Sequence, residues 1–194
     1  MAIKLRFGLG QTPLTQEEIE ALIPTHITTQ GELDQWEAEN IAEAETHTLG
    51  SPAFDPLSND NLRTLHKLMF NRTWKWAGEY RLRNTNFGVD KAQISVSVRK
   101  LCLDVRAQVA GKVAGLDEIA AKFHHRLVSI HPFPNGNGRH ARLATDLLLE
   151  LCGNERFRWG ITINDDRERR AAYITALQAA DRKNYEPILK FVRS

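Results

Sequence analysis

Apolar residues recur every three or four positions along most of the chain, which is the spacing of one face of an α-helix. The clearest stripes flank a short Gly-rich segment: Ile119, Phe123, Leu127 and Ile130 before it, and Leu143, Leu147 and Leu151 after it. Further patterns predict helices over about 98–110, 166–180 and 185–194. The chain is therefore expected to adopt a mainly all-α fold.

Two sequence signatures mark helix starts near the beginning of the chain. Thr15-Gln16-Glu17-Glu18 and Thr29-Gln30-Gly31-Glu32 both have the form of a capping box, in which a threonine and a glutamate satisfy each other's backbone N–H groups. The first predicts a short helix. The second predicts a longer helix over 30–48, ended by Gly50.

The hydrophobic period changes to two in the middle of the chain. Ile94, Val96 and Val98 alternate with Gln93, Ser95 and Ser97, which is typical of a half-buried strand. Together with the polar segment that precedes it, this alternation predicts a small β-hairpin over about 84–98.

Composition is consistent with one globular domain. A chain of 194 residues with 42% hydrophobic residues fits a single domain over 1–194, with an N-terminal segment 1–50 and a core 51–194. The net charge of +2 is too small to indicate nucleic-acid binding. No stretch approaches the ~20 apolar residues that a bilayer crossing needs, and no signal peptide is expected. We expect a cytoplasmic protein with neither a membrane nor a nucleic-acid partner.

The segment 131–142 carries the candidate chemistry. It reads His131-Pro132-Phe133-Pro134-Asn135-Gly136-Asn137-Gly138-Arg139-His140-Ala141-Arg142. Pro132 disfavours helical backbone at His131 and so turns the chain out of the preceding helix. Phe133 is a large apolar anchor for the loop. The glycines permit backbone conformations closed to other residues and let N–H groups approach a ligand.

The loop leads into a helix whose free N–H groups and positive dipole end attract phosphate. Arg139 and Arg142 lie three residues apart on one helix face, and guanidinium groups match phosphate oxygens in paired contacts. His131, at the edge of this anion site, can take a proton from a hydroxyl. Each feature alone also fits a tight connection or a packed histidine. Their combination in one short span favours transfer of a nucleotidyl or phosphoryl group to an alcohol.

This span resembles the Fic family motif, His-x-Phe-x-(Asp/Glu)-Gly-Asn-Gly-Arg-x-x-Arg, and departs from it at Asn135, where the family usually has an acid. Trp76-Ala77-Gly78-Glu79-Tyr80-Arg81 also resembles the Fic segment before the flap. The whole chain is similar to a bacterial Fic subfamily called mobile mystery protein B, linked to mobile elements and often encoded beside a small helix-turn-helix protein. The resemblance implies a Fic-type helical bundle with a β-hairpin flap and a helix-turn-helix partner encoded nearby.

The resemblance also implies an activity: a protein adenylyltransferase that moves AMP from ATP to a Ser, Thr or Tyr hydroxyl of a target protein or of itself. His131 would be the general base and Phe133 would pack the loop. The nucleotide phosphates would be bound by Gly136, Asn137, Gly138, Arg139 and Arg142. Gln93, Ile94 and Ser95 of the flap would hold the target.

Asn135 stands where the family's acid would hold Mg²⁺ against the nucleotide. Mg²⁺ is a hard cation that favours carboxylate oxygens. An amide oxygen can still be a ligand, but it carries no formal charge. We therefore expect weak Mg²⁺ binding at Asn135, with ATP itself supplying charged ligands.

Many Fic proteins carry an inhibitory helix with the pattern (Ser/Thr)-x-x-x-Glu-(Gly/Asn), whose glutamate pairs with the second motif arginine. Glu39-Asn40 matches the end of this pattern, but Gln35 stands at its first position. Glu39 shares a helix side with Trp36, which is expected to face the core, so Glu39 would point inward. The expected brake is an ion pair between Glu39 and Arg142, within the candidate inhibitory helix 30–48. The alternative is that Glu39 is a solvated acid.

Other functions stay open on the same scaffold. Glu39 could orient a water so that the enzyme removes AMP, or the chain could transfer phosphate. A third alternative is a catalytically silent partner of a mobile-element regulator. A histidine–metal hydrolase is disfavoured, because the adjacent His124 and His125 point about 100° apart on a helix.

Overall fold

The computed structural model describes residues 12–49 and 54–194, and it confirms a mainly all-α fold. The helices are α1 (Gln16–Glu20), α2 (Gln30–Thr48), α3 (Asn59–Phe70), α4 (Ile94–Gly111), α5 (Leu116–Ile130), α6 (Asn137–Leu151), α7 (Asp166–Asp181) and α8 (Glu186–Arg193), with a 3-10 turn over Lys91–Gln93. None of the helices in the described part of the chain combines the length and apolar character that a membrane crossing needs.

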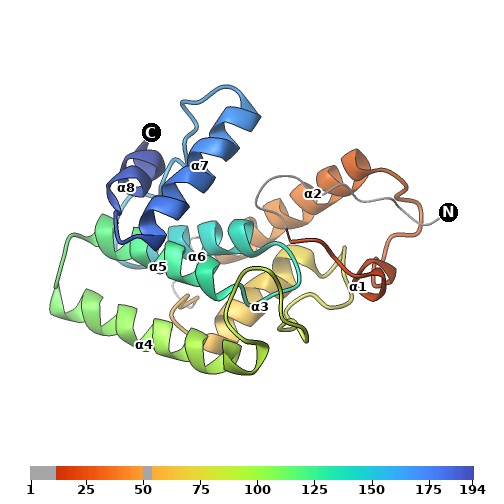
Figure 1. The fold of residues 1–194 in the computed structure, drawn as a ribbon, viewed down its shortest axis with the longest axis horizontal. Helices are drawn as coiled ribbons and strands as arrows, with labels where there is room; N and C mark the ends of the chain where they lie inside the picture. Colours follow the sequence, from red (N-terminus) through yellow and green to blue (C-terminus); the bar gives the residue numbers. More distant parts are fainter. Residues whose placement is uncertain (1–11, 50–53) are drawn as a thin grey trace.

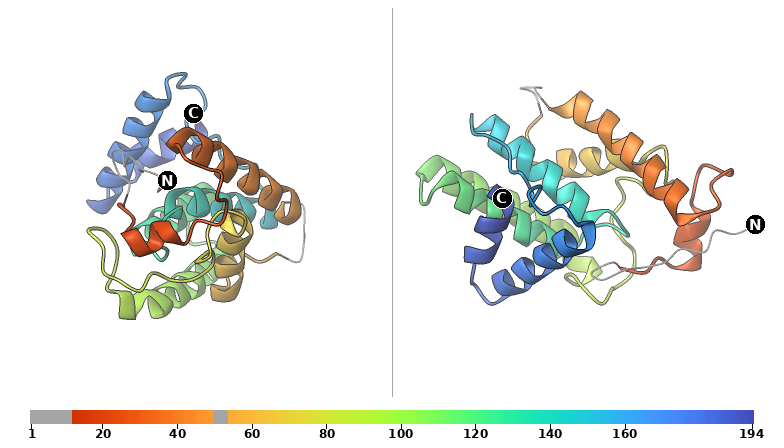
Figure 2. Two further views of the ribbon diagram at one scale, coloured as in Figure 1. Left: turned by 90° about the vertical axis from the view of Figure 1, so that its right-hand side faces the viewer. Right: turned by 90° about the horizontal axis from the view of Figure 1, so that it is seen from above.

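Helices α5 and α6 form the central pair, and the segment 131–136 connects them (Figure 1). Helix α4 packs along α5, and α3 contacts both α4 and α6. The pair formed by α7 and α8 lies on the other side of α5 from α4 (Figure 2). Helix α2 packs against α3 and runs past the end of α6 at which the connecting loop enters.

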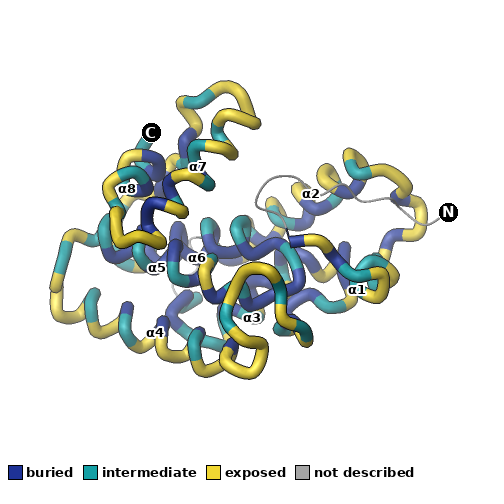
Figure 3. Tube along the Cα trace, viewed as in Figure 1, coloured by how far each residue is buried: buried dark blue, intermediate teal, exposed yellow. Residues whose placement is uncertain are grey.

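Two apolar clusters hold these helices together, and Figure 3 shows the buried backbone concentrated in α5 and α6. The larger cluster contains residues of every helix from α2 through α6, including Leu65, Met69, Phe123, Leu127 and Leu148. The smaller cluster joins α7 and α8 to the outer faces of α5 and α6 and includes Ala120, Leu149, Tyr173, Ile188 and Val192. The predicted stripes are buried except for Leu151, which is exposed at the end of α6.

Both predicted capping boxes are confirmed. Glu18 N–H donates to the Thr15 hydroxyl and Thr15 N–H donates to the Glu18 carboxylate; Thr29 and Glu32 repeat the arrangement at the start of α2. The structure ends α2 at Thr48, whereas the predicted stop at Gly50 lies outside the described residues.

The predicted β-hairpin over 84–98 was wrong. Residues 82–90 form a loop, and the alternating residues that follow belong to α4. Ile94 and Val98 are buried because they start a helical stripe that continues through Leu101 and Val105, while Val96 is 63% exposed. Ile94 and Val98 fit a spacing of four as well as of two, so the alternation alone did not distinguish helix from strand.

Asn40 ties α2 to the end of α3. Its side chain is 2% exposed. Its Nδ2 donates to the Leu68 carbonyl at 3.0 Å, and its Oδ1 accepts from the Arg72 backbone N–H at 3.0 Å. Both backbone groups lie where α3 ends, so the amide satisfies polar atoms that the helix itself leaves unpaired.

We predict that Asn40→Ala lowers the free energy of unfolding by about 1–3 kcal/mol, because both backbone groups lose a buried partner. Urea denaturation followed by circular dichroism measures the change. The matched control is Glu39→Ala, the exposed neighbour on the same helix, which should shift stability by no more than about 0.5 kcal/mol. Equal effects of the two substitutions would contradict the assigned role of Asn40.

Candidate active site

The loop between α5 and α6 depends on two left-handed backbone positions. His131 closes α5 with φ 54°, and Gly136 precedes α6 with φ 76°. A Cβ atom at Gly136 would lie 2.5 Å from the Phe70 ring. Gly136 is therefore required both by its conformation and by the contact with α3.

Phe133 packs the loop against α3. It is fully buried, and its ring stacks on His66 of α3 with centroids 3.7 Å apart. The Gly78 N–H donates to Nδ1 of His66, so Nε2 carries the proton and donates to the Asn135 carbonyl at 3.1 Å. His66 thus holds the loop through one stacking contact and one hydrogen bond, a role that no sequence pattern indicated.

The side chain of Asn137 also serves the loop. Its Oδ1 accepts from the Phe133 N–H at 2.9 Å and its Nδ2 donates to the Phe133 carbonyl at 2.8 Å. The amide is buried, so only backbone atoms of Asn137 are placed to meet a ligand. The Asn137 side chain therefore supports the loop, and the anion site predicted from the sequence would use backbone N–H groups and the arginines.

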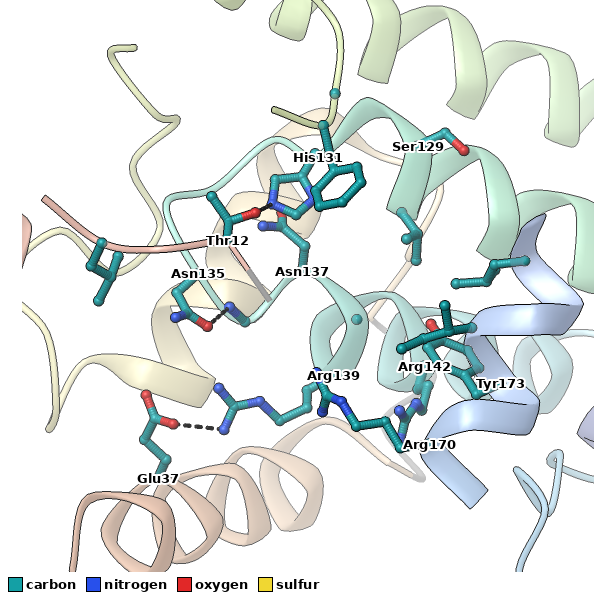
Figure 4. A pocket seen from close by; sticks show the side chains of 18 of the residues that line it. Thr12, Glu37, Ser129, His131, Asn135, Asn137, Arg139, Arg142, Arg170 and Tyr173 are labelled. Atoms are coloured by element: carbon teal, nitrogen blue, oxygen red, sulfur yellow. Dashed lines mark hydrogen bonds and ion pairs between the residues drawn. The ribbon is translucent and has the colours of Figure 1, made fainter. Parts of the chain in front are cut away.

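A pocket of about 630 Å³ opens beside this loop (Figure 4). Its lining comes from the loop, from α2, α5, α6 and α7, and from the segment before α1. Pockets of this size hold small organic ligands such as nucleotides. The motif residues His131, Asn135, Gly136, Asn137, Gly138, Arg139 and Arg142 all line it.

Positive charge gathers at the start of α6. The N-cap residue Gly136 makes no side-chain hydrogen bond to the first turn of that helix, and the backbone N–H groups of such a helix start can bind an anion. Arg139 and Arg142 lie on this side, and Arg170 of α7 lies next to them (Figure 4). Burial and the neighbouring Arg142 and Arg139 lower the pKa of Arg170. An anion bound here would relieve that repulsion.

Helix α7 supplies residues that the sequence did not point to. The guanidinium group of Arg142 lies over the Tyr173 ring, 4.7 Å from its centroid. Further along the pocket, the Asp181 carboxylate lies 2.8 Å from Nε2 of His125. The pocket therefore joins a cationic end at α6 to a polar end between α5 and α7.

His131 lies at the edge of the pocket, partly buried, and its Cβ packs against the loop over 82–90. Burial, reinforced by the nearby Arg81, lowers the pKa of His131 to about 4. The imidazole is therefore neutral near pH 7 and able to accept a proton. Its Nε2 lies 3.0 Å from the hydroxyl oxygen of Thr12.

The expected pairing of Glu39 with Arg142 was wrong. Glu39 is exposed and its carboxylate is 3.4 Å from the Gln35 amide nitrogen of its own helix. Glu37 faces inward instead, because the core-facing side of α2 carries Leu33, Glu37 and Asn40. Its carboxylate accepts from Arg139 Nη1 and from Trp74 Nε1, both at 2.7 Å.

The expected target-docking residues were also misplaced. Gln93 and Ser95 are exposed around the start of α4 and Ile94 is buried in the core, so none of them lines the pocket. Phe87 and Gly88 line it instead. A Cβ atom at Gly88 would lie 2.8 Å from the Cβ of His131, so this loop packs directly on the histidine.

The chain offers few metal ligands here. No group of three or more His, Cys, Asp or Glu side chains suited to a metal ion occurs within 12–49 and 54–194. The Oδ1 atom of Asn135 accepts from the Gly136 N–H at 2.5 Å. Asn135 is thus a single amide ligand at most, and Mg²⁺ would need most of its oxygen ligands from a bound nucleotide.

Comparison with known families identifies this arrangement. Residues 56–149 match the model of the Fic/DOC family. Residues 56–149 form a Fic/DOC domain. That match covers α3 to nearly the end of α6, and so includes the whole motif loop but neither Glu37 nor Arg170.

Curated relatives resemble parts of the chain. A uridine 5'-monophosphate transferase of Xanthomonas campestris pv. campestris is 58% identical over 36 residues, which is 19% of this chain and 7% of that protein. The protein adenylyltransferase Fic of Aedes aegypti is 34% identical over 73 residues, 38% of this chain and 13% of that protein. The chain thus covers only a small share of the length of these relatives.

Solved structures share the fold over most of the chain. The N-terminal Fic domain of a VirB-translocated Bep effector protein from Bartonella quintana superposes with a TM-score of 0.65 at 25% identity, covering 87% of this chain and 84% of that one. A Bartonella quintana Fic domain with bound ADP superposes with the same TM-score at 24% identity, covering 87% and 86%. The helical Fic fold is therefore established for this chain.

Buried imidazoles make the free energy of unfolding of this protein depend on pH. Burial lowers the pKa of His124 to about 3 and that of His140 to about 4, and holds the pKa of His66 well below 6.5. The unfolded chain takes up protons at these groups below about pH 6.5 and the folded chain does not, so stability falls as pH drops through that range. Asp146 opposes the trend, because burial raises its pKa to about 6.

We predict that the free energy of unfolding falls by roughly 3–4 kcal/mol per pH unit below about pH 6, because four buried imidazoles, these three and His131, outweigh one carboxyl. Urea denaturation at several pH values between about 7.5 and 5 measures the slope. Asp146→Asn should steepen it by about 1.4 kcal/mol per pH unit, because the opposing carboxyl is gone. A flat stability profile over this range would show that the imidazoles titrate normally.

Proposed function

We propose that the chain is a protein adenylyltransferase that transfers AMP from ATP to a hydroxyl of a target protein. The observation that carries this proposal is the neutral imidazole of His131, held beside a hydroxyl at the edge of a pocket that the start of α6 and three arginines make cationic. The relatives that transfer nucleotides and the ADP-bound structure of the same fold support it.

In this proposal the acceptor hydroxyl attacks the α-phosphorus of ATP, and its proton passes to Nε2 of His131. The bond from the α-phosphorus to the bridging oxygen breaks, and pyrophosphate leaves. Arg139, Arg142 and the first N–H groups of α6 stabilise the charge that develops on the phosphate oxygens. The stacking of Phe133 on His66 and the Asn137 clamp keep these groups in place during the transfer.

We further propose that Glu37, in place of Glu39, restrains the enzyme. Its carboxylate occupies Arg139 Nη1, a donor that would otherwise bind phosphate. The carboxylate is 7% exposed and the arginine side chain 36%, so the pair lies at the pocket wall and water screens it only partly. Nucleotide binding in the productive position would require Arg139 to exchange this carboxylate for a phosphate.

A second candidate is transfer of UMP, because one relative is a uridine 5'-monophosphate transferase. Removal of AMP, phosphate transfer and a silent binding role stay as alternatives on the same fold. We also retain the proposal of a cytoplasmic bacterial protein of the mobile mystery protein B subfamily, with a helix-turn-helix partner, which rests on the sequence resemblance alone.

We predict that Glu37→Gln raises nucleotide incorporation by about tenfold or more, because it removes the charge that holds Arg139 while keeping an acceptor for Trp74. The assay incubates the protein and a bacterial lysate with radiolabelled ATP, then with radiolabelled UTP. Intact-mass spectrometry distinguishes added AMP, UMP and phosphate.

Glu39→Gln is the matched control, since it makes the same change at an exposed position of the same helix. Adding His131→Ala to Glu37→Gln should abolish incorporation. Phosphate as the added mass would support the phosphotransferase. Absence of any incorporation by Glu37→Gln with either nucleotide would overturn the transferase proposal.

We predict that Asn135→Asp lowers the Mg²⁺ concentration needed for half-maximal incorporation, because a carboxylate binds Mg²⁺ better than an amide. The titration uses the Glu37→Gln background so that activity is measurable. The comparison variant is Asn154→Asp, which adds the same charge outside the pocket lining. An unchanged Mg²⁺ requirement in Asn135→Asp would show that this position does not contact the metal.

A further inference from the structure

The segment before α1 runs through the mouth of the pocket and is held there by the loop over 82–90. Arg83 Nη2 donates to the Pro13 carbonyl at 2.6 Å and forms an ion pair with Glu18 at 2.9 Å. Leu14 is 7% exposed. Pro13 favours extended backbone at the residue before it. This segment therefore lies against the loop beside His131 in the manner of a bound peptide.

Thr12 ends the described part of this segment and lines the pocket. Its hydroxyl lies 3.0 Å from Nε2 of His131, within the distance at which a general base takes a proton. Figure 4 shows the two side chains pointing toward each other across from the arginines of α6. The side chain is 5% exposed, so the protein fixes the position of this hydroxyl.

Other hydroxyls of the pocket lining are engaged elsewhere. Ser129 Oγ donates to the His125 carbonyl at 2.8 Å, and the Tyr173 hydroxyl lies 2.8 Å from Nε2 of His124. Both partners are residues of α5, and neither hydroxyl is hydrogen-bonded to His131. Among the described lining residues, Thr12 alone presents its hydroxyl to the proposed base.

We propose that Thr12 is an acceptor for the chain's own nucleotidyl transfer, in cis. This rests on the proposed function. The Thr12 Oγ1 attacks the α-phosphorus of ATP, an oxygen–phosphorus bond forms, the bond to the pyrophosphate leaving group breaks, and the hydroxyl proton moves to His131 Nε2. The product is a phosphodiester between Thr12 and AMP. Because the acceptor is part of the catalytic chain, the reaction needs no encounter between two proteins.

The contact between Thr12 and His131 also limits where a protein target can bind. A protein substrate must bring its hydroxyl to the position that Thr12 occupies, next to His131 and under the loop over 82–90. Thr12 and an external target are therefore competing acceptors. Self-modification at this position would leave a bulky nucleotide covalently attached at the mouth of the pocket.

The experiment uses the full chain carrying Glu37→Gln, incubated with ATP and Mg²⁺, and maps the modified residue by peptide mass spectrometry. We expect AMP on Thr12. Thr12→Val, which keeps the shape but lacks the hydroxyl, should lower self-incorporation by about tenfold or more, and Thr12→Ser should retain it. Thr46→Val is the matched control at an exposed threonine of α2.

Transfer in cis is tested by mixing two variants. A chain with His131→Ala and intact Thr12 is incubated with an active chain carrying Thr12→Val. We expect no label on Thr12 of the inactive chain, and in the active chain with intact Thr12 a fraction labelled per unit time that does not change with protein concentration. Label on the inactive chain would overturn the cis reaction.

The outcomes separate this inference from the proposed function. Labelling of lysate proteins, or of other residues of this chain, with Thr12 unmodified would overturn the role of Thr12 and leave the transferase intact. Absence of label on every protein with Glu37→Gln would overturn both.

Discussion

The site depends on a single constraint, the fixed conformation of the six residues 131–136 between α5 and α6. The chain enters the turn at His131 and leaves it at Gly136 in left-handed conformations. Glycine adopts this backbone readily, whereas at His131 it persists only where surrounding contacts determine it. The buried stacking of Phe133 on His66 and the paired hydrogen bonds of Asn137 supply those contacts. They bring the start of α6 and an imidazole to one wall of the same pocket.

The site contains a neutral histidine at one position and a cluster of positively charged arginines at another. Burial keeps His131 neutral and so able to act as a base, while the arginines of α6 and α7 crowd together at the cationic end. In this state their charge is balanced in part by Glu37, a buried carboxylate on α2. The carboxylate takes Nη1 of Arg139 and neutralises its charge, so this arginine attracts a phosphate less strongly, which is the physical basis for restraint of the proposed activity.

The N-terminal part of the chain contacts the site at two places. Helix α2 reaches the nucleotide-binding end through Glu37, and the segment before α1 reaches the acceptor end through Thr12. Both residues lie outside the part of the chain that matches the family model. The matched residues 56–149 therefore supply the motif loop and the start of α6, while α2, α7 and the segment before α1 complete the pocket around them.

Local sequence determined much of this protein. The capping boxes set the starts of α1 and α2, the apolar stripes set α5 and α6, and the motif placed His131, Phe133 and the arginines, because each signal acts within a few residues. Tertiary structure decided the rest. Ile94 and Val98 fit either period, and packing of the whole stripe made them helical. The choice of Glu37 over Glu39 depends on which side of α2 meets α3. Arg170, Tyr173 and Thr12 reach the site from distant parts of the chain, and sequence spacing carries no record of that proximity.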